Sequence, residues 1–197
     1  MVLVTQSAPN FIAPAILENN EIIQEFDFKK YSKNKKIILF FWPMDFTFVC
    51  PSEIIELSKS YIEFKKRNVR IVGISIDSVF VHQAWKNTSP KNGGIGKINF
   101  PMISDIKRDI QKAYGIEHPV LGVALRASFL IDSKGIIRHQ IVNDLPFGRS
   151  IEEIIRMVDA INFHEEHGEV CPANWKKGQD GMKPSLEGVS KYLSQRY

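Results

Sequence analysis

The sequence contains only two cysteines, Cys50 and Cys171, which stand 121 positions apart. This separation excludes a CxxC redox pair and a zinc knuckle. Two cysteines are also too few to hold a fold together, so any disulfide in this chain is expected to be transient and catalytic. The alternative is that each cysteine is a small buried hydrophobic residue, which is the better interpretation for a random cysteine. The local context of each cysteine must decide between the two.

Targeting segments and long apolar runs are also missing. The first ten residues lack the basic and then apolar pattern of a secretory signal. The longest apolar run, Ile37–Trp42, is far too short to cross a bilayer. With 197 residues, of which 44% are hydrophobic and 24% charged, the chain is long enough for one well-buried domain. We therefore expect a soluble, cytoplasmic protein that does not bind membranes.

The chain has no strong excess of charge, because 26 Lys and Arg against 22 Asp and Glu give a net charge of +4. One basic cluster could indicate an anionic partner such as nucleic acid; it consists of Lys29, Lys30, Lys33, Lys35 and Lys36. No aromatic and basic platform or nucleic-acid motif accompanies it. The cluster is interpreted as a solvated loop before a strand, and no nucleic-acid partner is expected.

Apolar periodicity predicts a βαβ unit in the first half of the chain. The run Lys36–Trp42 (KIILFFW) is typical of a strand buried on both faces, and Pro43 ends it. Apolar residues at helical spacing follow Cys50 and Pro51. The segment Asn68–Asp77 (NVRIVGISID) predicts a second buried strand. The two strands should therefore lie parallel, joined by a right-handed crossover.

The second half continues the alternation of strands and helices. The expected elements are short helices at Val79–Asn87 and Ile106–Tyr114, and hairpin strands at Ala127–Asp132 and Ile136–Val142. A long amphipathic helix should open at Ser150, because Glu153 completes a capping box with it. This order predicts an α/β protein that resembles the thioredoxin fold, with a central mixed sheet flanked by helices.

The pattern dissolves into Gly, Pro and Lys beyond Gly168. Only isolated apolar residues such as Trp175 remain, too few for a core of their own. We expect a domain at 1–165 and an extended C-terminal tail at 166–197, which carries Cys171 and lies against another surface.

Cys50 stands where a buried strand has ended and a helix begins, and Pro51 suits the first turn of that helix. Free backbone N–H groups and the positive end of the helix dipole stabilise an anion at such a position. They should therefore increase the share of thiolate at neutral pH. A thiolate is the nucleophile that attacks a peroxide oxygen. This context favours a reactive cysteine over a structural one.

Pro43, Thr47 and Cys50 have the spacing P-x3-T-x2-C. Thr47 can accept a hydrogen bond from a peroxide or donate one to the sulfur, and Pro43 can shield the thiolate from water. Arg126 is the candidate for a second positive group, since a parallel neighbour of the strand Ala127–Asp132 could bring its guanidinium to the pocket. From the spacing alone, an ordinary strand-end arginine is the commoner case.

Four segments resemble the typical two-cysteine peroxiredoxins of the bacterial alkyl hydroperoxide reductase type. The resemblance is carried by Trp42–Ile54 (WPMDFTFVCPSEI), Gly93–Gly96 (GGIG), Asn143–Pro146 with Gly148–Ser150 (NDLP and GRS), and His167–Trp175 (HGEVCPANW). These motifs are long and follow the family's order over nearly the whole chain.

The resemblance implies a thiol-dependent peroxidase that reduces hydrogen peroxide and organic hydroperoxides to water or alcohols. Cys50 would be the peroxidatic cysteine, which becomes a sulfenic acid. Cys171 of a second subunit would be the resolving cysteine, which forms an intersubunit disulfide with it. The other implied residues are Pro43, Thr47 and Arg126 in the pocket, with Glu53 and Arg149 as partners that orient the arginines.

The resemblance also implies partners but no cofactor. It implies a homodimer, assembled into a ring of five dimers, with the tail packed on the partner subunit. The electron donor would be thioredoxin or a flavoprotein disulfide reductase. The usual Tyr-Phe pair of the terminal helix is Tyr192-Leu193 here, so we expect intermediate sensitivity to overoxidation by excess peroxide.

Two other interpretations fit the sequence less well. A thioredoxin-fold holdase chaperone or redox-switched scaffold has no physical reason to require Thr47 and Arg126 beside Cys50. His164 and His167 flank two acidic residues, but they lack the HExxH spacing and a third ligand, so no metal site is expected.

Overall fold

The computed structural model describes residues 1–196. The chain forms two compact units, Met1–Ile151 and a second unit that begins at Glu152. The domain boundary expected after residue 165 lies near the end of helix α6 (Ile151–His167). None of the helices within the described residues combines the length and hydrophobicity needed to cross a membrane.

The first unit is built on a seven-stranded mixed sheet with the order β2-β1-β5-β4-β3-β6-β7. β3, β4 and β5 run parallel to one another, and the remaining neighbours are antiparallel. The strands are β1 (Ile12–Ile16), β2 (Ile22–Asp27), β3 (Lys36–Phe41), β4 (Val69–Ser75), β5 (Met102–Ser104), β6 (Arg126–Ile131) and β7 (Ile137–Asn143). The predicted mixed sheet is confirmed, and so is the parallel pairing of β3 with β4.

β3 lies at the centre of the sheet, between β4 and β6. Its residues from Ile37 to Phe41 are fully buried, as its unbroken apolar pattern predicts. Side chains alternate between the two faces of a strand. Phe41 accordingly packs in a core with the rings of Tyr114 and Phe129, at centroid distances of 5.4 and 5.9 Å, whereas Phe40 faces the other side of the sheet.

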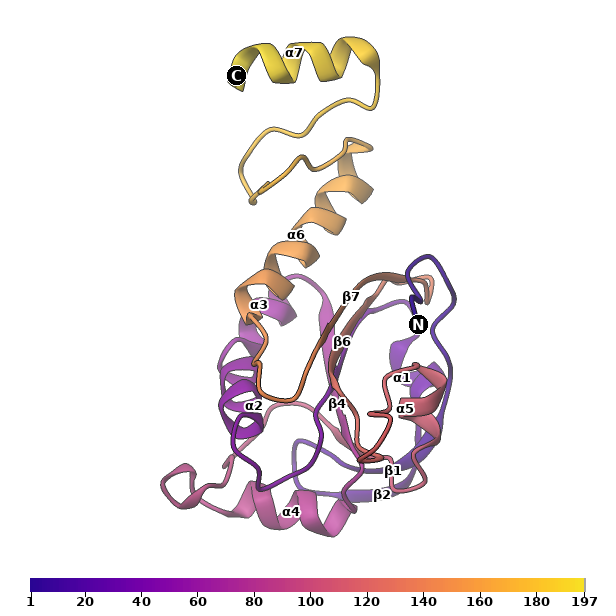
Figure 1. Cartoon of the computed structure of the whole chain (residues 1–197), viewed down its shortest axis with the longest axis vertical. Helices are drawn as coiled ribbons and strands as arrows, with labels where there is room; N and C mark the ends of the chain where they lie inside the picture. Colours follow the sequence, from indigo (N-terminus) through magenta and orange to yellow (C-terminus); the bar gives the residue numbers. More distant parts are fainter. Residues whose placement is uncertain (197) are drawn as a thin grey trace. The chain divides into compact units, whose positions relative to one another are not determined.

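Helices flank the sheet (Figure 1). On one side lie α2 (Cys50–Lys59) and α3 (Tyr61–Lys66), and on the other α1 (Phe28–Ser32) and α5 (Asp109–Ala113). The helix α4 (Val79–Asn87) has its predicted bounds, and the 3-10 helix η1 (Pro90–Asn92) follows it. α2 forms where its apolar residues recur at helical spacing, since Ile54 and Leu57 are fully buried on one face.

Several elements differ from the prediction. β1, β2, β5 and α1 were not expected, because elements this short carry little periodic signal. The basic cluster read as a loop begins inside α1, whose N-cap residue Asp27 accepts a hydrogen bond from Lys30 N at 3.1 Å. The helix expected after Cys50 is divided into α2 and α3. The hairpin of β6 and β7 is confirmed, although β6 begins one residue earlier, at Arg126.

Helix α5 is shorter than the predicted Ile106–Tyr114 because another group caps its start. The Asp105 carboxylate accepts hydrogen bonds from the backbone N–H groups of Ile110 and Gln111, at 3.1 and 2.8 Å. Arg108 has a φ of 61°, in the left-handed region, so the helix begins only after it.

The second unit consists of α6, a return segment and α7 (Leu186–Arg196). The return segment packs back on α6: Trp175 is buried, its ring lies 4.9 Å from that of Phe163, and its carbonyl accepts a hydrogen bond from Arg156 at 2.9 Å. Trp175 is thus buried against α6 and not within the expected tail itself. None of the described side chains of α7 is buried, and Leu186 is 93% exposed.

A buried polar pair ties the loop after β3 to helix α4. Asp45 accepts hydrogen bonds from Trp42 Nε1 at 2.8 Å and from the His82 ring, whose Nδ1 lies 2.7 Å from its carboxylate. Both side chains of the pair are fully buried. The loop leads directly to Cys50, so this pair fixes the approach of the chain to the start of α2.

Replacing His82 by Leu should lower the free energy of unfolding by about 3 kcal/mol, because it leaves the buried Asp45 carboxylate short of a partner. Urea denaturation measures the change. The control is Gln83→Leu on the same helix, where the side chain is only half-buried. Equal stability of the two variants would show that the pair does not hold the loop.

Candidate active site

Cys50 is the first residue of α2 and is fully buried. It follows the loop that leaves the end of β3, which is the strand-to-helix position expected from the sequence. The N-cap residue Val49 makes no side-chain hydrogen bond to the helix start. No side chain of a capping residue therefore competes with the Cys50 sulfur for the positive end of the helix dipole.

Thr47 lies in the loop before α2, three residues before Cys50. Its Oγ1 is 2.8 Å from Cys50 Sγ and 2.8 Å from the carbonyl oxygen of Met44. The hydroxyl has a single hydrogen, so it can donate to only one of these groups at a time. When it donates to the Met44 carbonyl, its lone pairs are free to accept a hydrogen bond from another donor near the sulfur.

Arg126 reaches the same sulfur from β6. Its Nη1 donates to Cys50 Sγ at 3.2 Å, and its Nε donates to the Leu145 carbonyl at 2.6 Å. The expectation that a parallel neighbour would bring it there was wrong, because β6 is antiparallel to β3. The start of β6 therefore lies beside the end of β3, with Phe40 opposite Ser128, and the loop to Cys50 leaves from that same end.

Glu53 joins Arg126 to a second buried arginine. It lies one turn after Cys50 on α2, and its Oε2 accepts from Arg126 Nη1 at 3.0 Å. Arg149 donates to the same carboxylate from Nε at 2.9 Å and from Nη2 at 3.0 Å. The backbone N–H of Arg149 also donates to Glu53 Oε1, at 2.8 Å. The carboxylate thus fixes both guanidinium groups.

The charges of this cluster balance only when the sulfur is an anion. Two guanidinium groups and one carboxylate leave a surplus positive charge next to Cys50 Sγ, and the side chains of Arg126, Arg149 and Glu53 are at most 4% exposed. Burial lowers the pKa of Arg149, and its hydrogen bonds to Glu53 oppose that shift. Because burial excludes water from these groups, a thiolate is the counter-charge that the cluster lacks.

Pro43 is buried beside Trp42 at the end of β3, but no hydrogen bond or ring contact joins it to Cys50. Sequence analysis did not identify two backbone carbonyl groups of the site. The Met44 carbonyl accepts a hydrogen bond from Thr47, and the Leu145 carbonyl accepts one from Arg126. Any residue type can supply a backbone carbonyl, so no sequence signal could have found them.

Cys171 belongs to the second unit. It is partly buried, and its Sγ lies 3.5 Å from the Ala160 carbonyl of α6. Burial raises the pKa of the Cys171 thiol, and the positive charge of Arg156 partly offsets this. Both cysteines are free.

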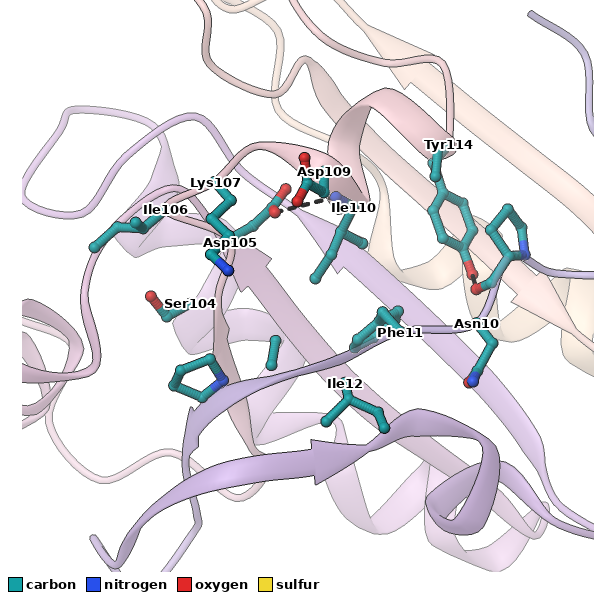
Figure 2. Close-up of a pocket in the computed structure, with 14 residues that line it drawn as sticks. Asn10, Phe11, Ile12, Ser104, Asp105, Ile106, Lys107, Asp109, Ile110 and Tyr114 are labelled. Atoms are coloured by element: carbon teal, nitrogen blue, oxygen red, sulfur yellow. Dashed lines mark hydrogen bonds between the residues drawn. The ribbon is translucent and has the colours of Figure 1, made fainter.

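A cavity of about 390 Å³ lies elsewhere in the first unit (Figure 2). It is lined by residues 9–14, the segment from Ser104 to Lys107, and α5 with Tyr114. None of the residues around the Cys50 sulfur lines it. The cluster around Cys50 is therefore separate from this cavity. Within residues 1–196, no group of three or more His, Cys, Asp and Glu side chains is placed to hold a metal ion.

Two family matches cover most of the chain. Residues 4–140 match the AhpC/TSA family, and residues 160–195 match the C-terminal domain of 1-Cys peroxiredoxin. The second match includes Cys171.

Similar proteins carry consistent names. Alkyl hydroperoxide reductase C of Buchnera aphidicola (subsp. Acyrthosiphon pisum) is 75% identical over 194 residues, which cover 98% of each chain. Alkyl hydroperoxide reductase C of Helicobacter pylori (strain J99) is 50% identical over 194 residues, again 98% of each chain. The reduced 2-Cys peroxiredoxin of Plasmodium vivax is 47% identical, with a TM-score of 0.95 over 98% of this chain and 100% of that chain. The chain therefore belongs to the AhpC/TSA family and is a peroxiredoxin, a thiol-dependent peroxidase.

Proposed function

We propose that Cys50 is the peroxidatic cysteine and that Cys171 of a second subunit is the resolving cysteine. The Cys50 thiolate attacks one oxygen of the hydroperoxide, the O–O bond breaks, and the leaving alkoxide or hydroxide takes a proton to become alcohol or water. Cys171 then attacks the Cys50 sulfenic acid, which forms the disulfide and releases water. The observation that carries this proposal is the convergence of Arg126 Nη1 and Thr47 Oγ1 on one buried sulfur.

Each neighbour of the sulfur has a role in the first step. Arg126 stabilises the thiolate and polarises the O–O bond through its forked donors. Thr47 holds the peroxide by accepting its proton in a hydrogen bond while donating to the Met44 carbonyl. Pro43 excludes water from the thiolate. Glu53 and Arg149 orient Arg126 through the shared carboxylate.

The second step requires movement of both cysteines. Cys50 is buried in the first turn of α2, so that turn must unwind before a second sulfur can reach it. The segment after α6 that carries Cys171 must also move. The apolar residues that α7 exposes, Leu186, Val189 and Leu193, support packing of this segment on the partner subunit of a homodimer. A ring of five such dimers is the assembly that we propose.

The substrates and the reductant follow from the same chemistry. The names of the bacterial relatives support organic hydroperoxides alongside hydrogen peroxide as substrates. The disulfide must be reduced by an external dithiol, either thioredoxin or a flavoprotein disulfide reductase. Intermediate sensitivity to overoxidation and a cytoplasmic location stay predictions. A holdase or scaffold is not favoured, because such a protein needs no paired Thr47 and Arg126 at a buried thiol.

Cys50→Ser should abolish peroxide consumption with dithiothreitol, whereas Cys171→Ser should retain it, because a small thiol can replace the resolving cysteine. After a peroxide pulse, non-reducing electrophoresis should show a thiol-sensitive dimer band for the unaltered protein and none for either variant. Normal turnover by Cys50→Ser would refute the proposal. An intersubunit band in Cys171→Ser would refute the assignment of Cys171.

Thr47→Val should lower the second-order rate constant of Cys50 oxidation about a hundredfold, since the loss of one positioned hydrogen-bonding group costs about that much in other enzymes. Thr47→Ser keeps the hydroxyl and should stay within about threefold of the unaltered protein. Stopped-flow measurements with hydrogen peroxide give both constants. Equal rates for the two variants would mean that the hydroxyl is not used.

Formation of the intersubunit disulfide should accelerate as the pH rises through and above the usual pKa range of a cysteine thiol. Burial raises the pKa of Cys171, so its thiolate is scarce at neutral pH and accumulates only as the pH increases. Quenched-flow electrophoresis at several pH values measures the rate. Arg156→Gln removes the charge that lowers the Cys171 pKa, and should move the acceleration to still higher pH. A rate independent of pH would contradict this account.

A further inference from the structure

The edge of the Arg149 guanidinium is largely taken up by hydrogen bonds. Nε and Nη2 donate to Glu53, and Nη1 donates to the Ala127 carbonyl at 2.6 Å. The side chain is 0% exposed, so water does not solvate the charge from above or below the plane. Only a group that lies against a face of the plane can stabilise the cation further.

Phe40 lies against one of these faces. Arg149 Cζ is 3.4 Å from the centroid of the Phe40 ring, well within the range of about 6 Å over which a ring face attracts a cation. The attraction is strongest where water is excluded, and both side chains are fully buried.

The position of Phe40 is set by the sheet itself. It belongs to β3, which pairs with β4 on one side and β6 on the other. It lies opposite Ser128 of β6, and Arg126 stands two residues before Ser128 on that strand. Residues two apart on a strand share a face, so Phe40 and Arg126 lie on the same face of the sheet.

We propose that Phe40 is a positioning residue of the peroxidase reaction, whose ring face holds the Arg149 guanidinium and, through Glu53, the Arg126 donor at the Cys50 sulfur. This inference rests on the proposed role of Cys50. Glu53 Oε2 accepts from both arginines at 3.0 Å, so a tilt of Arg149 displaces the carboxylate. Arg126 Nη1 then follows, because the same nitrogen bonds Glu53 at 3.0 Å and the sulfur at 3.2 Å.

Stepwise fluorination of the Phe40 ring tests this proposal with little change of shape. Mono-, di- and trifluorophenylalanine are introduced at position 40, and the oxidation of Cys50 by hydrogen peroxide is followed by stopped flow. Because fluorine withdraws charge from the ring face, the rate constant should fall with each substitution, to about a tenth with the trifluoro ring. The midpoint of the pH dependence of Cys50 alkylation should rise in parallel. If neither the rate constant nor the midpoint changes across the fluorination series, the proposal is overturned.

The matched control is the same fluorination series at Phe41. This neighbour is equally buried on β3, but its ring packs against Tyr114 and Phe129 instead of a guanidinium. Fluorination of Phe41 should change the rate constant of Cys50 oxidation by less than about twofold. An equal fall at both positions would also overturn the proposal, since it would reflect general packing.

The Cys50→Ser variant distinguishes a failure of the proposed function from a failure of the proposed role of Phe40. If Cys50→Ser still consumes peroxide, the proposed function fails. If Cys50→Ser is inactive while fluorinated Phe40 reacts at the unaltered rate, only the role of Phe40 fails. Phe40→Leu and Phe40→Tyr give a second comparison in which only the tyrosine keeps a ring face, so only the leucine variant should slow.

Discussion

The Glu53 carboxylate bridges two buried guanidinium groups, and the geometry around the Cys50 sulfur depends on it. It accepts hydrogen bonds from Arg126 at 3.0 Å and from Arg149 at 2.9 and 3.0 Å. Two buried arginines without a counter-ion would repel each other and would have no water to solvate them. One carboxylate leaves one positive charge over, and this charge lies beside Cys50 Sγ. The carboxylate therefore holds the two arginines in place and also leaves a net positive charge beside the sulfur.

The sheet decides which residues take part in this cluster. Because β6 is antiparallel to β3, its first residue, Arg126, lies at the end of β3 from which the loop to Cys50 departs. Glu53 is on the first turns of α2, one turn from the sulfur. The end of β3, the start of β6 and the first turns of α2 thus meet at one end of the central strands. The cavity of Figure 2 has different lining residues.

When both cysteines are free thiols, the Cys50 sulfur is closed off from solvent. Cys50 is fully buried and Cys171 is partly buried in a separate compact unit. A protected sulfur suits the reaction with a small peroxide, whereas the disulfide that we propose with a second chain would need local unfolding. The segment before the sulfur is an irregular loop that contacts it through the Thr47 hydroxyl, and segments of this kind open at low cost.

The mixed sheet, the strand-to-helix position of Cys50 and the family could all be predicted from the sequence, because these depend on unbroken apolar runs and long local motifs. The elements β1, β2, β5 and α1 were missed because they are too short for a periodic signal, and the strand that begins at Arg126 was expected to have a parallel neighbour, whereas both of its neighbours are antiparallel. The folded structure was needed to show that Arg126 contacts the Cys50 sulfur, that Glu53 bridges it to Arg149, and that Phe40 lies against that second guanidinium. These contacts join residues up to 109 positions apart, and their formation depends on strand direction and side-chain facing, which no local pattern encodes.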